Sequence, residues 1–328
     1  MVRVLSESEV ASVLELEALL PALGEAFEKQ YAGEVERPER PHYPIGTGLD
    51  PDAPTESTGT GLCMPAYLHG EPYVTTKLAT VCPDNPDRGL PTVTAQLALV
   101  DAKTGQPRSY MAANRITSAR TGCIGGLAAR ELAAEGSIEL GVIGAGTQAR
   151  WQTRAIAAAV GSRLEAIRVY SPSDSKVDCA ADLEDELGVP ATAVETPREA
   201  VSASSVVVTA TTSTEPVFPG EALAEGTLVV AVGAYTPEMR ELDATTIDRA
   251  ATIVADVPEE AAETGDLREH DDRELVPLGG VLAGEFDRES SAEIVVVASV
   301  GSAVLDAATA AFVYDRARET ELGTDVPL

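Results

Sequence analysis

The sequence predicts an α/β protein with a doubly wound parallel sheet, joined to an α+β domain that is discontinuous along the chain. Residues 138–170 have the pattern of a strand, a glycine turn, a helix and a second strand, and strands then alternate with helices up to residue 301. Short strands without intervening helices precede this region. We therefore assign residues 126–301 to the parallel sheet, and residues 1–125 with 302–328 to the other domain.

The glycine turn lies between the first strand of the parallel sheet and the helix that follows, and it reads Gly144-Ala145-Gly146-Thr147-Gln148-Ala149. Gly144 allows a sharp turn, and Gly146 lets the backbone approach a pyrophosphate. Ala149 is small enough for the helix to pack close to the sheet, and the helix N-terminus offers N–H groups to phosphates. In a strand-to-helix context, this motif predicts a Rossmann-type dinucleotide-binding domain.

The other domain begins with helical spacing and continues with strand-like runs. Ser6 to Glu9 has the pattern of a capping box, and Pro21 is predicted to interrupt the helix that follows. Residues 46–61 are rich in Gly, Thr, Asp and Pro, which indicates an exposed loop. Thr117 is predicted to cap a helix that ends shortly before the glycine turn. Four runs between these features predict an antiparallel sheet, at residues 64–67, 72–81, 91–100 and 107–112.

The last apolar strand and the last helix are predicted at residues 294–300 and 301–318. The parallel sheet would then also contain strands near residues 191–194, 205–211, 226–232 and 252–256. The final helix is rich in alanine and is expected to return to the first domain, which makes that domain discontinuous.

The charge of the chain is strongly acidic, with 53 acidic and 24 basic residues among 328 and a net charge of -29. Such a surface repels nucleic acid and anionic membranes, so neither is expected as a partner. The carboxylates are spread along the chain, which favours adaptation to high salt, where self-repulsion is screened. Only four lysines are present, so a lysine in an apolar, strand-like setting stands out.

The chain shows no apolar run long enough to cross a membrane and no pattern of a secretory signal, so a soluble, cytoplasmic protein is expected. The four cysteines are scattered without the spacing of a metal site. We expect them to be reduced thiols, and we expect no bound metal.

Three cations of the first domain are candidates for a substrate site. Lys77 lies in a strand-like run that is otherwise mostly uncharged, Arg120 lies one helical turn after Thr117, and Arg40 lies in an extended segment bounded by prolines. Lysine and arginine together form a receptor for a carboxylate. A lysine held near two arginines would have a lowered pKa, which suits a proton donor or acceptor. The alternative is that each cation pairs with one of the abundant carboxylates.

A series of short motifs in order along the chain resembles the ornithine cyclodeaminase and mu-crystallin family. The motifs in the first domain are Arg37-Pro38-Glu39-Arg40, Met64-Pro65-Ala66-Tyr67, Thr76-Lys77-Leu78, Gly89-Leu90-Pro91-Thr92-Val93 and Ile116-Thr117-Ser118-Ala119-Arg120-Thr121. Those in the second are the glycine turn, Thr214-Glu215-Pro216, Arg240-Glu241-Leu242-Asp243, Gly265-Asp266 and Ser299-Val300-Gly301. Their order and spacing cover almost the whole chain, although the loop at residues 46–61 is longer than is usual for the family.

The resemblance implies a homodimer whose first domain supplies the substrate-binding site and the dimer sheet, with the active site at the domain cleft. It implies that Arg40, Lys77 and Arg120 hold the substrate carboxylate, with Thr92 close by. The dinucleotide phosphates would lie against the glycine turn, at Gly144, Gly146, Thr147, Gln148 and Ala149, with Thr117 and Thr121 near them. The nicotinamide side would be bordered by Thr211, Gly233 and Gly301.

Members of this family transfer a hydride between the carbon that bears an amine and a nicotinamide ring, and they differ in the fate of the imine. Cyclodeaminases carry an aspartate after the fifth strand of the nucleotide domain, whereas the corresponding stretch here, residues 232–237, has no carboxylate. Ornithine cyclisation is therefore the alternative, with Glu238 or Asp306 as a substitute base, and an amino acid dehydrogenase or imine reductase is the leading interpretation. A third interpretation, a binding protein without catalysis, is disfavoured by the set Arg40, Lys77 and Arg120.

The cofactor is expected to be NAD or NADP. The second strand of the parallel sheet ends at Ser171, where an acidic residue would bind the ribose hydroxyls of NAD. Asp174 could turn back toward the ribose, whereas Ser171, Ser173 and Lys176 could hold the 2'-phosphate of NADP. The local charge is not clearly basic, so the sequence leans slightly to NAD.

Overall fold

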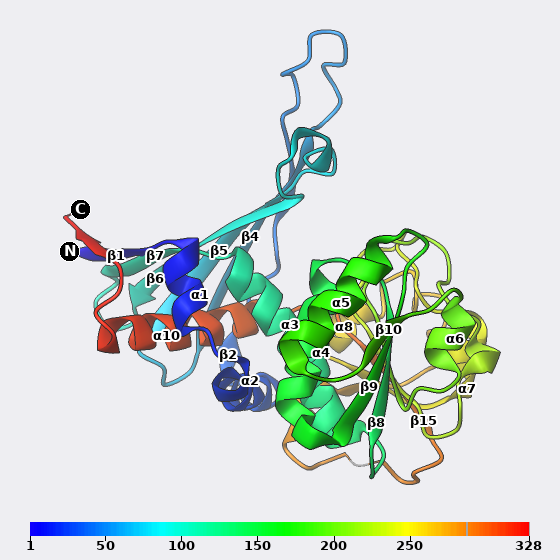
Figure 1. Cartoon of the computed structure of the whole chain (residues 1–328). Coiled ribbons are helices and arrows are strands. Elements are labelled where there is room, and N and C mark those ends of the chain that lie inside the picture. The colour runs from blue at the N-terminus through cyan, green and yellow to red at the C-terminus, as the bar shows by residue number, and fades with distance from the viewer. Residues whose placement is uncertain (287, 328) are drawn as a thin grey trace. The chain divides into compact units, whose positions relative to one another are not determined.

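The computed structural model describes residues 1–286 and 288–327, which form two compact units (Figure 1). Unit 1 contains Met1–Glu15, Ala32–Arg120 and the segment from Ala303 onward, and unit 2 contains Leu16–Tyr31 and Thr121–Ser302.

The sequence analysis drew the boundaries near residues 125 and 302 and left residues 16–31 in the first domain. Helix α2 (Leu16–Tyr31) instead groups with unit 2. The reason is its packing, since its buried residues include Leu19, Leu23 and Phe27, and the helix contacts α4 (Thr147–Val160) and α9 (Leu278–Leu282) of that unit.

Unit 1 is built on an eight-stranded sheet. Its strands are β1 (Val2–Leu5), β2 (Val35–Glu36), β3 (His42–Ile45), β4 (Gly59–Leu68), β5 (Tyr73–Val81), β6 (Val93–Asp101), β7 (Pro107–Ala112) and β16 (Thr324–Val326). They lie in the order β16-β1-β7-β6-β5-β4-β2, with β3 paired to β4. The predicted antiparallel runs correspond to β4 through β7. Strand β1, parallel to β7, and strand β16, antiparallel to β1, were not predicted.

The buried face of this sheet packs against helices α1 (Glu7–Val13) and α10 (Ala303–Glu319). The core between them contains Leu97, Leu99 and Met111 from the strands and Val10 and Val313 from the helices. The period of two along each strand places these side chains on one face, so burying them fixes the register of β5, β6 and β7.

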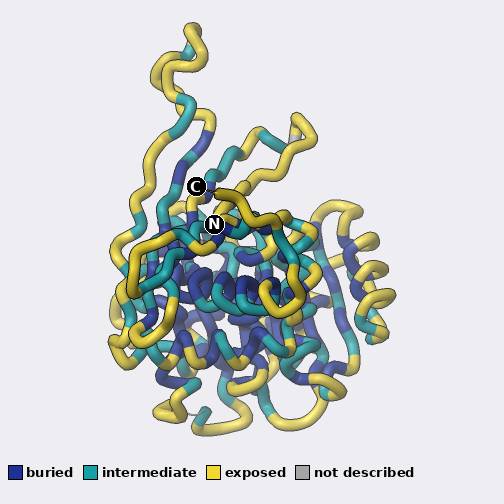
Figure 2. Tube along the Cα trace, turned by 90° about the vertical axis from the view of Figure 1, so that its left-hand side faces the viewer, coloured by how far each residue is buried: buried dark blue, intermediate teal, exposed yellow. Residues whose placement is uncertain are grey.

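The loop between β3 and β4 is exposed, as predicted, and it extends away from the sheet of unit 1 (Figures 1 and 2). Within residues 46–58 only Gly46 and Ala53 are half-buried, and the others are exposed. Strand β4 begins at Gly59, two residues before the predicted end of the loop.

Unit 2 is built on a parallel sheet in the order β10-β9-β8-β11-β12-β15-β13-β14. Its strands are β8 (Ile138–Ile143), β9 (Leu164–Tyr170), β10 (Ala191–Ala193), β11 (Val206–Thr209), β12 (Leu228–Ala231), β13 (Ala250–Ala255), β14 (Leu275–Pro277) and β15 (Ile294–Ala298). The chain moves outward from β8 to β10 and then returns to β11, so the strand order reverses between β8 and β11. Ligands of doubly wound sheets bind at the carboxyl ends of the strands at this switch point.

The helices of unit 2 follow the predicted alternation. Besides α2, α4 and α9 they are α5 (Ser175–Leu187), α6 (Pro197–Val201), α7 (Ala244–Arg249), α8 (Pro258–Ala261) and most of α3 (Asn114–Leu132), with short 3-10 turns at Pro86–Arg88 in unit 1 and at Gly161–Arg163 and Gly220–Ala222 in unit 2. The doubly wound prediction is confirmed, and β14 is the strand that it missed. No helix in the described residues is long and apolar enough to cross a membrane.

Two predicted helix boundaries were wrong. Pro21 lies inside α2, and the chain breaks earlier, at Leu14 and Glu15. A proline near a helix start removes a single hydrogen bond, and the buried apolar face of α2 offsets this loss. Thr117 lies within the first turn of α3, which starts at Asn114. The Asn114 side chain accepts a hydrogen bond from Ala95 N at 2.7 Å, which ties the helix start to β6.

Candidate active site and cofactor site

A buried ion cluster in unit 1 joins two of the predicted cations. Lys77 lies on β5, Arg120 on α3 and Asp306 in the first turn of α10. The Lys77 Nζ lies 2.6 Å from Asp306 Oδ2, and the Arg120 Nε lies 3.1 Å from Asp306 Oδ1. All three side chains are at most 8% exposed. Two cations share one carboxylate, so the cluster keeps a net positive charge, which suits an anionic ligand.

The protonation of this cluster is set by burial and by its own charges. Burial lowers the pKa of Lys77 to about 8; Asp306 opposes this shift, whereas Arg120 and Arg40 add to it. Burial alone raises the pKa of Asp306, but Arg120 and Lys77 outweigh it, so the pKa of this carboxyl lies below its usual value. Asp306 is therefore an anion near neutral pH, and Lys77 can lose or gain a proton there.

Arg40 is half-buried in the segment before β3 and lies close enough for its charge to act on Lys77. The structure thus brings together the three predicted cations. Thr92 is not brought to them, since it is exposed beside the start of β6. Register pairs Lys77 with Leu97, and Thr92 lies five residues before Leu97, which puts Thr92 roughly 17 Å along the strands from Lys77.

The glycine turn of unit 2 has the geometry that a dinucleotide needs. Gly144 has a φ of 110°, and a Cβ there would lie 2.5 Å from Ala210 O, so glycine is required. Gly146 is the N-cap of α4, makes no side-chain cap, and has open space where a Cβ would lie. A pyrophosphate can therefore approach the first N–H groups of α4.

The other residues predicted at the phosphates lie on α4 and α3. Thr147 is exposed, Gln148 is half-buried, and Ala149 is buried against the sheet. The buried Gln148 Oε1 has no hydrogen-bond partner in the described residues, so it can accept a ligand donor. Thr117 and Thr121 lie one turn apart on α3, half-buried and buried respectively.

Helix α3 supports α4 through close backbone packing. A Cβ on Gly122 would lie 2.5 Å from Trp151 O, and one on Gly126 would lie 2.6 Å from Ala155 O. The Gln152 side chain donates to Thr121 O at 2.7 Å. These contacts fix the position of α4, and with it the helix N-terminus that is predicted to face the phosphates.

The loop after β9 carries serines where an acidic residue is usual in NAD sites. Ser171 is buried, its hydroxyl lies 3.3 Å from that of Ser173, and the Ser173 hydroxyl lies 2.7 Å from that of Ser175. Lys176 pairs with Glu195 at 3.2 Å and lies over the Tyr170 ring. The local donors are thus hydroxyl groups.

Two buried carboxylates hold the carboxyl ends of the central strands, and the sequence analysis missed both roles. Glu241 accepts hydrogen bonds from Thr211 N, Thr209 Oγ1 and Gly233 N, each at 2.7 Å. Burial raises the pKa of Glu241, and these three donors oppose the shift. The one signal available was the motif Arg240-Glu241-Leu242-Asp243, which does not say what the side chain binds.

Asp256 is the second of these carboxylates, and it binds the chain that follows β15. It accepts hydrogen bonds from Ser299 Oγ at 2.8 Å, Val300 N at 3.0 Å and Gly301 N at 2.7 Å. The predicted nicotinamide residues Thr211, Gly233 and Gly301 are thus held by carboxylates at the strand ends where a ligand of this fold binds.

The stretch after β12 has no carboxylate at residues 232–237, and of the two suggested substitutes, Glu238 is exposed on unit 2. Asp306 is fully buried and engaged by Lys77 and Arg120. No group of His, Cys, Asp and Glu side chains in the described part of the chain has the arrangement of a metal site.

A parallel sheet with a glycine turn at its switch point, combined with a cationic receptor in a second unit, defines a two-unit dinucleotide-binding protein. The chain belongs to the ornithine cyclodeaminase/mu-crystallin family, whose model matches residues 2–321. It is 32% identical to an alanine dehydrogenase of Archaeoglobus fulgidus, and the alignment covers 98% of this chain and 97% of that protein.

Solved structures agree in fold over the full length. The structure of the Delta(1)-pyrroline-2-carboxylate reductase of Thermococcus litoralis, in complex with NADH and L-proline, has a TM-score of 0.90, 31% identity and coverage of 99% of this chain and 100% of that one. An archaeal alanine dehydrogenase dimer with bound NAD has a TM-score of 0.88, 32% identity and coverage of 99% of both chains.

Proposed function

We propose that this protein transfers a hydride between a nicotinamide cofactor and the α carbon of a small amino acid or its imine. The chain is an NAD(P)-dependent oxidoreductase of amino acids or imines, in keeping with its family and with relatives that act on alanine and on pyrroline-2-carboxylate. The buried cluster of Lys77, Arg120 and Asp306 carries the proposal, because it combines a receptor for a carboxylate with a group that can exchange a proton.

Each part of the receptor has a separate task in this proposal. The bound cofactor supplies or accepts the hydride. Arg120 and Arg40 bind the substrate carboxylate, arginine being suited to a bidentate fork. Lys77 protonates the imine nitrogen during reduction and accepts that proton during oxidation, since its pKa of about 8 lets it hold or release a proton near neutral pH.

Ornithine cyclodeamination is the second candidate. It would consume ornithine and release proline and ammonia without net change of the cofactor. The absence of a carboxylate at residues 232–237 disfavours it, and the engagement of Asp306 by two cations lowers the basicity of the nearest substitute.

A substrate panel followed at the nicotinamide absorbance tests the proposal. Pyrroline-2-carboxylate, piperideine-2-carboxylate and pyruvate with ammonia would be assayed with NADH and with NADPH, in molar salt because the net charge of -29 is expected to destabilise the fold at low ionic strength. We expect oxidation of the cofactor with at least one of these substrates. Ammonia release from ornithine without such oxidation would contradict the proposal.

The serines after β9 lead to a prediction for cofactor choice. We expect Ser171→Asp to weaken NADPH binding by at least about tenfold, roughly 1.4 kcal/mol, while NADH binding changes little. The reason is that an acidic residue at this strand end repels a 2'-phosphate and accepts hydrogen bonds from ribose hydroxyls. Fluorescence titration with both cofactors measures the change. Thr192→Asp, which adds a charge in the middle of β10, is the control. Unchanged NADPH affinity in Ser171→Asp would refute the placement of Ser171 beside the 2' group of the ribose.

We propose a homodimer formed through the exposed face of the unit 1 sheet. Val4 and Tyr110 are paired across β1 and β7, Tyr110 is paired with Ala98, and the alternation places Leu78 on the same face. Val4, Leu78 and Tyr110 are 40–45% exposed, an apolar patch that suits a second copy. We expect light scattering to give a dimer for the wild type and a monomer for the double variant Leu78→Glu and Tyr110→Glu. A dimer that survives both changes would contradict this interface.

A further inference from the structure

We propose that Asp306 is a positioning residue, which holds Lys77 and Arg120 with one oxygen each and keeps Lys77 in its protonated form. The inference rests on the proposed function, in which Lys77 and Arg120 meet the substrate. Helix α10 would then do more than pack against the sheet. Through Asp306 it would fix the positions of Lys77 and Arg120 and favour the protonated form of Lys77, without contacting the substrate itself.

The two carboxylate oxygens of Asp306 bind different cations. Oδ2 contacts the Lys77 ammonium at 2.6 Å, and Oδ1 accepts from Arg120 Nε at 3.1 Å. Because this contact uses the Nε of Arg120, the terminal nitrogens of the guanidinium can still form a fork with a ligand carboxylate. Asp306 therefore fixes the distance between Lys77 and Arg120, and each cation keeps N–H donors that can bind a ligand.

The charges around Lys77 come from three elements. Asp306 faces it from α10, Arg120 from α3, and Arg40 from the segment before β3. Its cross-strand partners, Met64 on β4 and Leu97 on β6, are uncharged and buried. Burial and both arginines favour the neutral amine, and Asp306 is the negative charge that opposes them.

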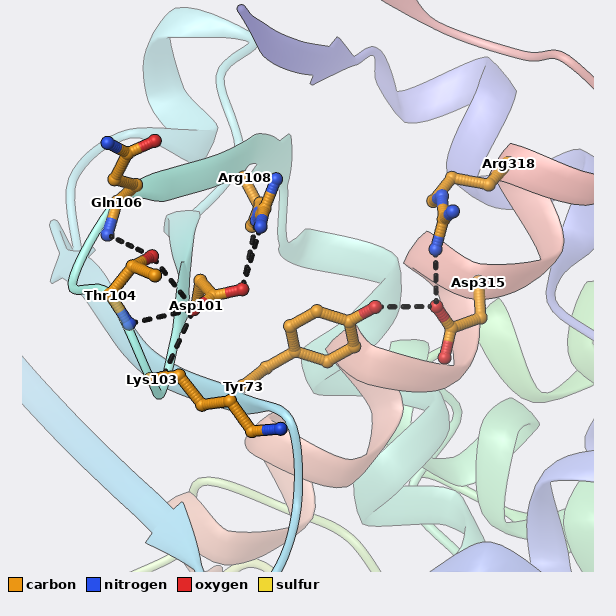
Figure 3. Close-up of polar contacts among 8 residues, drawn as sticks. All are labelled: Tyr73, Asp101, Lys103, Thr104, Gln106, Arg108, Asp315 and Arg318. Carbon is orange, nitrogen blue, oxygen red and sulfur yellow. Dashed lines mark hydrogen bonds and ion pairs between the residues drawn. The ribbon is translucent and has the colours of Figure 1, made fainter.

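A purely structural ion pair, one that only ties α10 to the sheet, is the competing explanation. The chain offers a matched control for it, because Asp315 links the same helix to the same strand (Figure 3). Tyr73 OH on β5 donates to Asp315 Oδ1 at 2.9 Å, and Arg318 lies 3.7 Å from that carboxylate. Asp315→Asn therefore removes a carboxylate between α10 and β5 and leaves Lys77 untouched.

The pH profile of imine reduction separates the two explanations. Reduction needs a protonated Lys77, so kcat/KM of the wild type should fall as the pH rises through about 8. In Asp306→Asn the fall should move to lower pH by roughly one to three units, because the neutral amide no longer favours the ammonium. Asp315→Asn should keep the wild-type profile. A uniformly lower rate for Asp306→Asn, with its profile unmoved, would overturn the inference.

A readout without turnover keeps this test separate from the proposed function. The chain has four lysines, so 13Cε-lysine gives few NMR signals, and the Lys77→Arg variant identifies the one from Lys77. We expect the Lys77 signal to titrate at lower pH in Asp306→Asn than in the wild type or in Asp315→Asn. An unchanged titration would overturn the role of Asp306 whether or not a substrate is found. A shifted titration, in a wild type that turns over no amino or imino acid, would instead count against the proposed function alone.

Discussion

Lys77→Ala should reduce turnover by at least about 1000-fold and leave the affinity for NADH nearly unchanged. The variant removes the buried ammonium that supplies the proton for the imine nitrogen, and with it one positive charge of the cluster. It also leaves Asp306 with Arg120 as its remaining cation in the cluster. Steady-state kinetics with the best substrate of the panel, together with a fluorescence titration of NADH, measures the two quantities.

The control for this variant is Lys103→Ala. Lys103 is an exposed lysine of the same unit whose backbone N–H donates to Asp101 at 3.1 Å, so removing its side chain keeps that contact (Figure 3). We expect wild-type rates from this control. Loss of NADH binding in Lys77→Ala without a loss in kcat would refute Lys77 as a substrate-site residue.

Glu241→Ala should lower the free energy of unfolding by about 3 kcal/mol or more and weaken NADH binding by more than about tenfold. The change leaves the N–H groups of Thr211 and Gly233 without their buried acceptor, and each such loss costs roughly 1–3 kcal/mol. The same two residues border the predicted nicotinamide position, so a less ordered backbone there should also weaken NADH binding. Urea unfolding and NADH titration measure the two effects.

Glu238→Ala is the matched control, since Glu238 is an exposed glutamate three residues earlier in the same loop. We expect it to leave both stability and cofactor affinity near the wild type, as is usual for exposed positions. If Glu241→Ala proved unstable but bound NADH normally, the strand ends would have no part in holding the nicotinamide.

Local patterns predicted the elements that depend on neighbouring residues. The glycine turn was recognisable because Gly144 and Gly146 meet backbone requirements that few residue types satisfy. Lys77 was recognisable because a lysine rarely lies in a buried strand of a chain with so few lysines. Arg40 and Arg120 were predicted through motif order, and the structure places both near Lys77.

Features that depend on distant pairing were not predictable in the same way. Arg120 and Asp306 are 186 residues apart, and no local pattern predicts that the first turn of α10 packs beside β5. The packing of α2 with unit 2 also depends on partners far along the chain, namely α4 and α9. Glu241 and Asp256 look like ordinary acidic residues in a chain with 53 of them, so their buried contacts appear only in the fold.

Deuterium transfer from NADH that carries deuterium at both positions of nicotinamide C4 tests the central claim most directly. Purified wild-type protein in molar salt would be incubated with the labelled cofactor and pyrroline-2-carboxylate, or with pyruvate and ammonia. Mass spectrometry and NMR would then locate the label. The proposed function predicts one deuterium at the α carbon of the amino acid product for each cofactor oxidised. An unlabelled α carbon, or conversion of ornithine to proline and ammonia with no net cofactor oxidation, would contradict it.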